Sequence, residues 1–273
     1  MPVPPVFSRQ LAGGSPSARG LLLTVLGELV LPCGGHAWTA SLIDVLARFG
    51  IEEKATRQAV MRTAAAGWLA AERQGRRTRW ALTADAATLL RHGAERIYGF
   101  RGSQQEWEGR WLVVHARIPD VDRRARHHVQ SRLSWAGLGV LAPGLWVSPR
   151  ADRLGEVRRV LEDAGLTDAY CFLARHEYGD PQAMIHTAWD VPAIASAYRE
   201  FLAGVEASDG ADPLAAQVGL VHRWRRFPQI DPALPRELLP QPWPGDTAAI
   251  RFRERHDELR LAAQQAWRTL DAT

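Results

Sequence analysis

A helical spacing of small and apolar residues is clearest between Glu53 and Gly67. The run EKATRQAVMRTAAAGW places a set of short side chains on one face of a helix: Thr56, Ala59, Val60 and Thr63. The opposite face carries side chains long enough to reach phosphates or base edges: Lys54, Arg57, Gln58 and Arg62. The spacing therefore predicts a helix that packs its short side chains inward, presents a basic face outward and ends at Gly67.

The next residues, AAERQGRRTRWAL, form two short runs of strand character, which predict a β-hairpin with its turn at Gln74 and Gly75. Four arginines lie on this hairpin: Arg73, Arg76, Arg77 and Arg79. Like charges this close repel one another, and a fold tolerates them more readily when a polyanion supplies the counter-charge. A helix followed by a basic hairpin is the element order of a winged helix-turn-helix, which favours DNA binding. For the helix taken alone, an ordinary solvated face is the alternative.

The elements around this pair fit the same fold. Ser17 is placed to cap a first helix, and a second helix, capped by Thr39 or Ser41, follows a short strand. Thr83 is placed to cap a further helix after the hairpin. Helix, short strand, helix, basic helix and hairpin together predict an N-terminal winged-helix domain.

Beyond a polar, glycine-containing linker the pattern changes to the order β-α-β-β-α-β, which is typical of a ferredoxin-like domain. Its strands are predicted in RWLVVHARIP, in the two halves of GLGVLAPGLWVSPR and in AYCFLARHEY. Helical segments separated by a proline-rich link follow. The sequence thus predicts an α+β chain of four parts: a flexible arm (1–16), a winged-helix DNA-binding domain (17–100), a ferredoxin-like central domain (108–178) and a helical C-terminal domain (181–273).

Charge is distributed unevenly along the 273 residues. Residues 1–100 hold 12 Lys and Arg against 7 Asp and Glu, whereas the remaining 173 residues hold 22 against 23. Residues 1–100 therefore carry a net charge of +5 and the remainder a net charge of −1, which gives the total formal charge of +4. The positive charge of the first part points to nucleic acid as its partner. Cys33 and Cys171 belong to no metal-spaced motif, and no apolar run is long enough to cross a bilayer. We therefore expect a cytoplasmic protein with reduced thiols, no metal site and no membrane partner.

A second group of basic residues surrounds Trp224 in the run LVHRWRRFP. Guanidinium groups bind phosphates through paired donors, and an indole ring stacks on flat ligands, so this run is a candidate site for an acyl-CoA or other phosphorylated effector. The candidate residues are His222, Arg223, Trp224 and Arg226. The same spacing also fits a core tryptophan in a helix whose arginines are solvated or ion-paired.

Several stretches together resemble the PaaX family of bacterial repressors of phenylacetate catabolism, along nearly the whole chain after about Ser17. They are SARGLLLTVLGELVLPCGGHAW, GIEEKATRQAVMRTAAAGWLAAERQGRRTRWALT, EWEGRWLVV, LGVLAPGLWVSPR and LVHRWRRFPQIDPALPRELLPQPWPG. The resemblance implies a winged helix, a central ferredoxin-like domain similar to the CRISPR-associated Cas2 proteins, and a helical C-terminal domain. It also implies a homodimeric repressor, released from its operator by phenylacetyl-CoA or a related aryl-acyl-CoA thioester. Such a dimer would bind double-stranded DNA at a near-palindrome.

A Cas2-like, metal-dependent nuclease is the alternative within the same resemblance. Asp120 follows the first central strand, where such nucleases keep a metal-binding aspartate, and two such carboxylates across a dimer would hold Mg²⁺. However, Asp120 also follows a proline at a strand end, where an aspartate more often caps a helix. We therefore expect a regulator that is not an enzyme and that needs no cofactor apart from its acyl-CoA effector.

Overall fold

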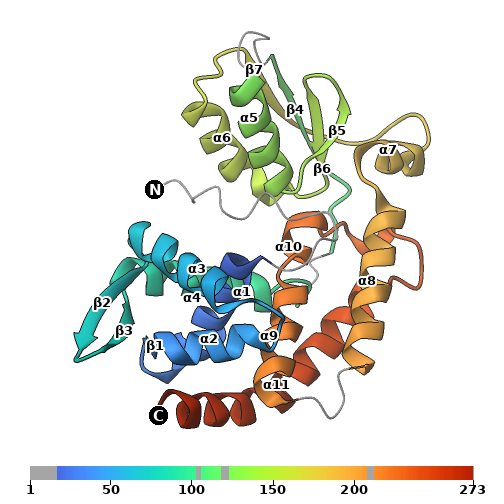
Figure 1. Ribbon diagram of the computed structural model, residues 1–273. Coiled ribbons are helices and arrows are strands. Elements are labelled where there is room, and N and C mark those ends of the chain that lie inside the picture. Colours follow the sequence, from blue (N-terminus) through green and yellow to red (C-terminus); the bar gives the residue numbers. More distant parts are fainter. Residues whose placement is uncertain (1–16, 103–105, 118–122, 208–211, 273) are drawn as a thin grey trace. The chain divides into compact units, whose positions relative to one another are not determined.

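A computed structural model describes residues 17–102, 106–117, 123–207 and 212–272 (Figure 1). Two predictions, the flexible arm over residues 1–16 and the metal-binding role of Asp120, lie outside the described residues. The described chain forms two compact units. The first, called the hairpin unit, comprises residues 17–102, 200–207, 212–226 and 248–272, and the second, called the central unit, comprises residues 106–117, 123–199 and 227–247.

The N-terminal half of the hairpin unit combines helices with a small sheet. Its elements are α1 (Ala18–Val25), η2 (Leu26–Val30), η3 (Leu31–Cys33), β1 (His36–Trp38), α2 (Thr39–Ala47), α3 (Glu53–Ala65), β2 (Leu69–Gln74), β3 (Arg77–Leu82) and α4 (Ala84–Tyr98). The Oγ atom of Ser17 accepts the N–H of Gly20 at 3.0 Å, so the predicted cap of the first helix is confirmed. The predicted cap of the second helix is wrong. α2 begins at Thr39 itself, without a side-chain cap, and the Thr39 hydroxyl donates to the carbonyl of Thr78 at 3.0 Å.

Strands β1, β3 and β2 form an antiparallel sheet in that order. Trp80 at its centre pairs with Ala37 on one side and Ala71 on the other, and Trp80 and Ala37 are buried. The hairpin turn consists of Gly75 and Arg76, one residue later than predicted. The φ angle of Gly75 is 62°, and a two-residue turn of type II′ needs a positive φ at its first position. Arg76 therefore stands at the tip of the hairpin.

The helical spacing predicted for α3 is confirmed. Thr56, Ala59, Val60 and Thr63 are all buried. Gly67 follows the helix with a φ of 77°, a conformation that ends helices and that glycine adopts without strain. Because only short side chains face inward, α3 lies close to α1 and α2 and turns its long side chains to the solvent.

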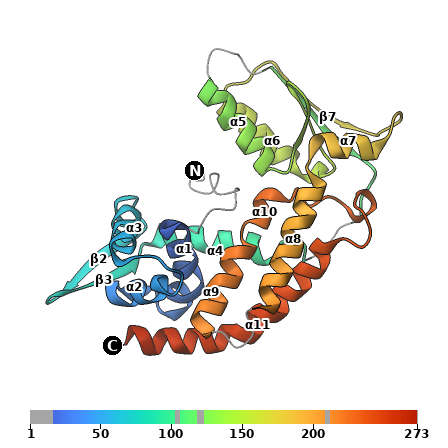
Figure 2. The same cartoon turned by 45° about the vertical axis from the view of Figure 1, so that its right-hand side comes forward.

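Helices from the C-terminal part of the chain complete the hairpin unit (Figures 1 and 2). α9 (Pro213–Trp224) packs along α1, and residues 248–271 of α11 (Pro244–Asp271) reach β1 with their last turn. The end of α8 (Val191–Glu206) also belongs here. Trp224 of α9 stacks on Phe252 of α11 with ring centroids 4.6 Å apart. The predicted helical C-terminal segments thus contribute to the same core as residues 17–102.

The central unit has the predicted element order. Its elements are β4 (Trp111–Ala116), α5 (Arg123–Trp135), β5 (Gly139–Ala142), β6 (Leu145–Ser148), η4 (Ala151–Arg153), α6 (Leu154–Asp163), β7 (Ala169–Ala174), α7 (Pro181–Ala188), most of α8, α10 (Phe227–Ile230) and η5 (Arg236–Leu238). The sheet has the order β5-β6-β4-β7 with every neighbouring pair antiparallel. β4 and β5, which α5 connects, are therefore separated by β6, and this is the split β-α-β arrangement of ferredoxin-like domains.

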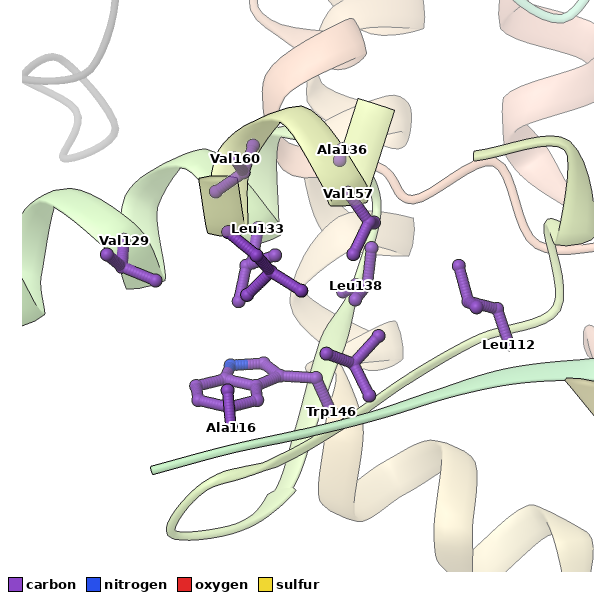
Figure 3. Close-up of a cluster of buried hydrophobic side chains, with 11 residues drawn as sticks. Leu112, Ala116, Val129, Leu133, Ala136, Leu138, Trp146, Val157 and Val160 are labelled. Carbon is purple, nitrogen blue, oxygen red and sulfur yellow. The ribbon is translucent and has the colours of Figure 1, made fainter. Parts of the chain in front are cut away.

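Helices α5 and α6 cover one face of this sheet (Figure 3). The core between them joins Leu112, Val114, Ala116 and Trp146 of the strands to Val129, Leu133, Val157 and Val160 of the helices. Successive strand residues point to opposite faces, so Tyr170 and Phe172 of β7 point away from these helices. Each of these two aromatic side chains is 56% exposed, and β7 is an edge strand.

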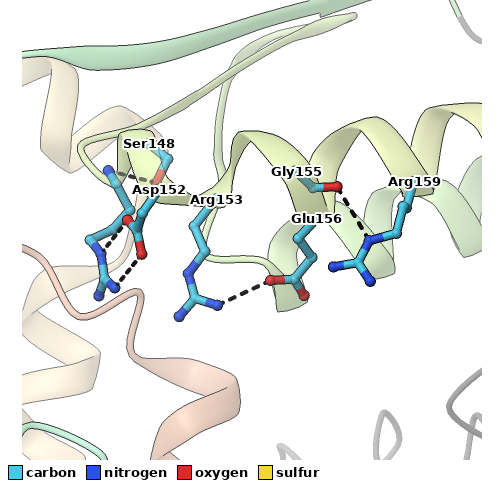
Figure 4. Close-up of polar contacts among 7 residues, drawn as sticks. Ser148, Asp152, Arg153, Gly155, Glu156 and Arg159 are labelled. Carbon is cyan, nitrogen blue, oxygen red and sulfur yellow. Dashed lines mark hydrogen bonds and ion pairs between the residues drawn. The ribbon is translucent and has the colours of Figure 1, made fainter.

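The run LWVSPR leads from β6 into α6 through a set of polar contacts (Figure 4). The Arg150 guanidinium donates to both carboxylate oxygens of Asp152, at 2.9 and 2.8 Å, and the Arg150 N–H donates to Ser148 Oγ at 3.2 Å. The bond from Arg150 lowers the pKa of Asp152, and the same bond raises the pKa of Arg150. Arg150 therefore holds the turn that begins α6.

The proline-rich link packs on α8. Tyr198 stacks on Phe227 with ring centroids 4.1 Å apart, and its hydroxyl donates to Asp231 Oδ2 at 2.5 Å. Trp243 meets the same tyrosine edge-on at 6.0 Å. Because proline fixes φ and provides no N–H, this stretch crosses the surface of α8 as a loop that contains only the short helices α10 and η5.

Candidate nucleic-acid interface

The outward face of α3 is basic. Lys54, Arg57, Gln58 and Arg62 are all exposed. Met61 lies on the same face, one turn after Arg57, and is 59% exposed. Met61 is not among the predicted residues, although its helical position places it among these polar side chains. Together they offer cations, an amide and one apolar side chain, which are the groups that contact phosphates, base edges and thymine methyl groups.

Arg57 is paired within its own helix. Its Nε donates to Oε1 of Glu53 at 2.7 Å, and the side chains of Arg57 and Glu53 are 57% and 59% exposed. An ion pair this exposed contributes little to stability, so Arg57 loses little by exchanging Glu53 for another anion.

The hairpin presents cations on both faces and at its tip. Arg77 and Arg79 lie on one face of the sheet, because they are two residues apart on β3. Arg73 pairs with Thr78 and therefore points to the other face. Arg73, Arg76 and Arg77 are exposed, whereas Arg79 is half-buried. Three of the four predicted arginines thus offer their charge directly to the solvent.

The α3 helix and the hairpin together form one strongly positive region. Residues 53–82 hold seven Lys and Arg against two Asp and Glu, a net charge of +5. α3 packs against β2, and in both views the hairpin projects from the helices (Figures 1 and 2). A protruding positive hairpin beside a positive helix suits a polyanion with a groove between two charged strands.

The second predicted site, at the end of α9, is placed differently. Trp224 has 0% exposure, and its Nε1–H donates to the carbonyl of Ile97 at 2.9 Å. Its ring packs against Phe252 and Phe201. In this conformation Trp224 is part of the core of the hairpin unit and has no free face on which a ligand could stack.

His222 and Arg225 attach α9 to α1. His222 Nδ1 lies 3.0 Å from Thr24 Oγ1, and Arg225 Nη1 donates to Thr24 Oγ1 at 2.9 Å and to the carbonyl of Gly20 at 3.0 Å. Burial is the main cause that lowers the pKa of His222 to about 4, and the charges of Arg225 and Arg223 contribute to the same shift. Burial also lowers the pKa of Arg225 to about 10. Arg225 belongs to the same basic run LVHRWRRFP and lies on the His222 face of the helix, three residues on.

Arg223 and Arg226 attach the end of α9 to α8. Arg223 Nη2 donates to the carbonyl of Gly204 at 3.2 Å, and Arg226 Nη2 lies 4.0 Å from Glu200 Oε2. Burial lowers the pKa of Arg223, and the neighbouring charge of Arg226 acts in the same direction. The four predicted effector residues therefore surround one helix end but contact four different helices, α1, α4, α8 and α11.

Three further features concern function in the described part of the chain: metal ligation, free thiols and membrane-spanning helices. Within residues 17–102, 106–117, 123–207 and 212–272, no group of three His, Cys, Asp or Glu side chains is arranged to hold a metal ion. Cys33 and Cys171 are free thiols, and burial raises the pKa of each. No described helix has both the length and the apolar composition that crossing a membrane requires.

Three family models match consecutive parts of the chain. Residues 17–86 match the PaaX-like protein, residues 104–185 the PaaX protein central Cas2-like domain, and residues 189–269 the PaaX-like protein C-terminal domain. The transcriptional repressor PaaX of Escherichia coli K12 is 32% identical over 248 residues, which cover 85% of this chain and 77% of that protein. An uncharacterized protein of Mycobacterium tuberculosis shares the fold, with a TM-score of 0.61 and 22% identity over 93% of this chain and 100% of that one. The chain belongs to the PaaX family.

Proposed function

We propose that this protein is a transcriptional repressor that binds DNA through a winged helix-turn-helix. In this proposal α3 is the recognition helix in the major groove, and the β2–β3 hairpin, residues 69–82, is the wing. The observation that carries the proposal is the net charge of +5 over residues 53–82, with the cations exposed on α3 and on the hairpin. The related Escherichia coli protein is named a transcriptional repressor, which supports the same function.

The side chains divide between two tasks. Gln58 and Arg62 lie on the exposed face of α3 and have the bidentate groups that read adenine and guanine edges. Lys54 and Arg57 lie nearer the start of the helix, where they would meet phosphates. On the wing, the phosphate contacts would come from Arg73, Arg76, Arg77 and Arg79.

The proposal includes a homodimer. Two recognition helices on a near-palindromic operator would enter major grooves about 34 Å apart, or a multiple of that spacing. The exposed aromatic side chains of Tyr170 and Phe172 on the edge strand β7 support an interface between copies at the open face of the central sheet. A protein that acts on an operator in this way works in the cytoplasm.

We further propose an aryl-acyl-CoA effector, of the phenylacetyl-CoA type, that releases the repressor from a phenylacetate-type catabolic operon. Arg223 and Arg226 are the candidates for holding CoA phosphates, because guanidinium groups bind phosphate through paired donors. His222 and Trp224 would hold the end of α9, and with it these arginines, in place, because His222 contacts α1 and Trp224 is buried in the core. The effector releases DNA only to the extent that it binds the two conformations of the repressor with different affinity.

The wing provides the test of DNA binding. Replacing Arg76 and Arg77 together by Ala should weaken binding to any duplex and reduce the slope of log K against log salt by roughly two units, because about two phosphate contacts are lost. Fluorescence anisotropy over a salt series measures both quantities. The matched control is Arg251→Ala with Arg260→Ala, which removes the same charge from two exposed positions of α11 and should leave the slope unchanged. An unchanged slope in the wing variant would contradict the proposal, and duplex cleavage with Mg²⁺ would favour the nuclease instead.

The effector is tested separately, by adding phenylacetyl-CoA and free phenylacetate to the complex with the DNA upstream of the gene. Release by the CoA ester but not by the free acid supports the proposed effector class. Arg223→Ala with Arg226→Ala should bind the same DNA but need more of the ester for release, because the proposed contacts with the CoA phosphates are removed together with the contacts to Gly204 and Glu200. Release at an unchanged ester concentration would show that both arginines serve only to join α9 to α8.

A further inference from the structure

Two arginines of the wing share the face of one tryptophan. Cζ of Arg77 lies 4.3 Å from the ring centroid of Trp38, and Cζ of Arg79 lies 5.8 Å from it. The strand register brings them together: Trp38 of β1 pairs with Arg79 of β3, and Arg77 lies two residues along the same face. The negative face of an indole ring attracts guanidinium groups at such distances.

Trp38 is the contact that the two arginines have in common. Nε of Arg79 is buried and has no hydrogen-bond partner among the residues that the structure describes. In the strand register Glu72 of β2 lies opposite Arg79 of β3. The Oε1 atom of Glu72 lies 3.7 Å from Nε2 of His36. The two guanidinium groups would otherwise repel each other, so the ring both lowers that cost and fixes where they stand.

Trp38 is itself held by the C-terminal helix. Its backbone N–H donates to Oδ1 of Asp271, the last residue of α11, at 2.8 Å. β1 is an edge strand, so its outer backbone groups have no strand partner, and Asp271 satisfies one of them. A bond between residues so far apart in sequence ties the start of the sheet to the end of the chain.

The Asp271 contact is one of three along the same stripe of α11. His256 Nε2 lies 3.3 Å from Oε2 of Glu28, and Cys33 Sγ lies 4.0 Å from the carbonyl of Gln264. At 3.6 residues per turn, His256, Gln264 and Asp271 fall within about 80° around the helix axis. The stripe faces η2, η3 and β1 in chain order, so α11 is fixed in register along the elements that lead to Trp38.

We propose that Trp38 is a positioning residue that sets the wing arginines for contact with DNA phosphates, and that Asp271 of α11 keeps Trp38 in place. This inference rests on the proposed DNA-binding role of the wing. In this proposal α11 directly stabilises the surface that contacts DNA. Loss of the hydrogen bond between Asp271 and Trp38 would make the indole ring under Arg77 and Arg79 more mobile and would weaken binding to DNA.

A double-mutant cycle tests the role of Trp38. The probe is a random-sequence duplex of about 30 base pairs at about 50 mM salt, because phosphate contacts do not depend on sequence. Trp38→Leu should weaken binding about fivefold, whereas Trp38→Phe, which keeps an aromatic face, should weaken it less than about twofold. In the background of Arg77→Ala with Arg79→Ala, Trp38→Leu should cause no further loss.

The background variant also separates positioning from folding. A full fivefold loss that persists without the two arginines would mean that Trp38 only stabilises the fold, and the inference would be overturned. If the arginine variant itself binds as wild type does, the proposed role of the wing fails together with the inference. If the arginine variant binds weakly while Trp38→Leu binds normally, only the inference fails.

For Asp271, the proposed contact predicts a change in DNA affinity opposite to the change that net charge alone predicts. Removing a negative charge should strengthen binding to DNA, yet Asp271→Ala should weaken it about threefold, because β1 loses its anchor. Asp271→Asn keeps an oxygen acceptor and should bind nearly as wild type does. The matched control is Glu258→Ala, on an exposed position of the same helix, which should bind equally well or slightly better. Tighter binding by Asp271→Ala would overturn this part of the inference.

Discussion

The wing and the end of α9 each place arginines around a tryptophan, but the two tryptophans differ in burial. In the wing, Arg77 and Arg79 lie over the outer face of a half-buried Trp38, and Arg77 keeps its charge at the surface. At the end of α9, Trp224 is completely buried, and Arg225 donates to the carbonyl of Gly20. Arginine content alone therefore predicts neither role. An arginine whose donors are used by backbone carbonyls holds helices together, whereas one held by its flat face still has its donors available for phosphate.

The largest effect that this comparison predicts is on stability. Trp224→Ala should lower the free energy of unfolding by about 3 to 5 kcal/mol, because it removes a fully packed ring and its hydrogen bond to Ile97. Trp38→Ala should cost less than about 2 kcal/mol, since its ring is only half-buried. Urea unfolding followed by circular dichroism measures both. Equal losses would remove the distinction between the two tryptophans.

The next effect is a pH dependence of stability, which arises from His222 at the end of α9 and has no counterpart in the wing. His222 has its pKa lowered to about 4 in the folded state, mainly by burial, whereas an unfolded histidine takes up its proton near pH 6.5. Between these two pH values the unfolded chain binds the extra proton, so stability falls as the pH drops through this window. The whole loss amounts to about 3 kcal/mol and is absent at pH 7 and above.

Unfolding curves from pH 7.5 down to about pH 4.5 measure this dependence. His222→Gln keeps a polar group beside Thr24 but cannot take up the proton, so it should flatten the curve over this range. A variant that retains the wild-type slope would place the responsible group elsewhere.

Sequence periodicity was sufficient to predict the buried face of α3, beside the wing, and insufficient for the end of α9. The burial of Thr56 and Thr63 follows from their spacing alone, because a surface helix buries one face whatever its neighbours are. The direction of Trp224 depends on Ile97 and Phe252, which belong to other helices. Local spacing contains no information about which distant element covers a face, so it favoured a core position for Trp224 without excluding the ligand interpretation.

Turn chemistry explains the smaller differences. The predicted turn at Gln74 and Gly75 is displaced by one residue, because glycine occupies the first central position, where a positive φ is needed. The hydroxyl of Thr39 bonds across to Thr78 of β3 rather than to its own helix. The bond of Thr39 depends on the pairing of β1 with β3, which joins residues about forty positions apart and which no local pattern specifies.

A smaller effect separates the two surfaces of the proposed DNA-binding region, α3 and the wing. Replacing Gln58 or Arg62 of α3 by Ala should relax base preference at particular operator positions by about 1 to 3 kcal/mol, if each makes a bidentate contact with a base. The wing arginines should instead lose affinity for every sequence alike. Binding to a set of operators with single base changes distinguishes the two. A uniform loss in the α3 variants would assign Gln58 and Arg62 to phosphates.

The smallest predicted effect concerns the ion pair between Arg57 and Glu53 on α3. Glu53→Gln should change the free energy of unfolding by less than about 0.5 kcal/mol, because both side chains are more than half exposed and the pair is screened by salt. The same change should tighten DNA binding about two- to threefold, since it removes a negative charge beside the phosphates and releases Arg57 to contact them. The matched control is Glu254→Gln, which breaks a similarly exposed pair with Arg251 on α11. It should give the same small change in stability and no change in affinity. If both variants tighten binding equally, net charge alone accounts for the gain, and Arg57 has no place in the interface.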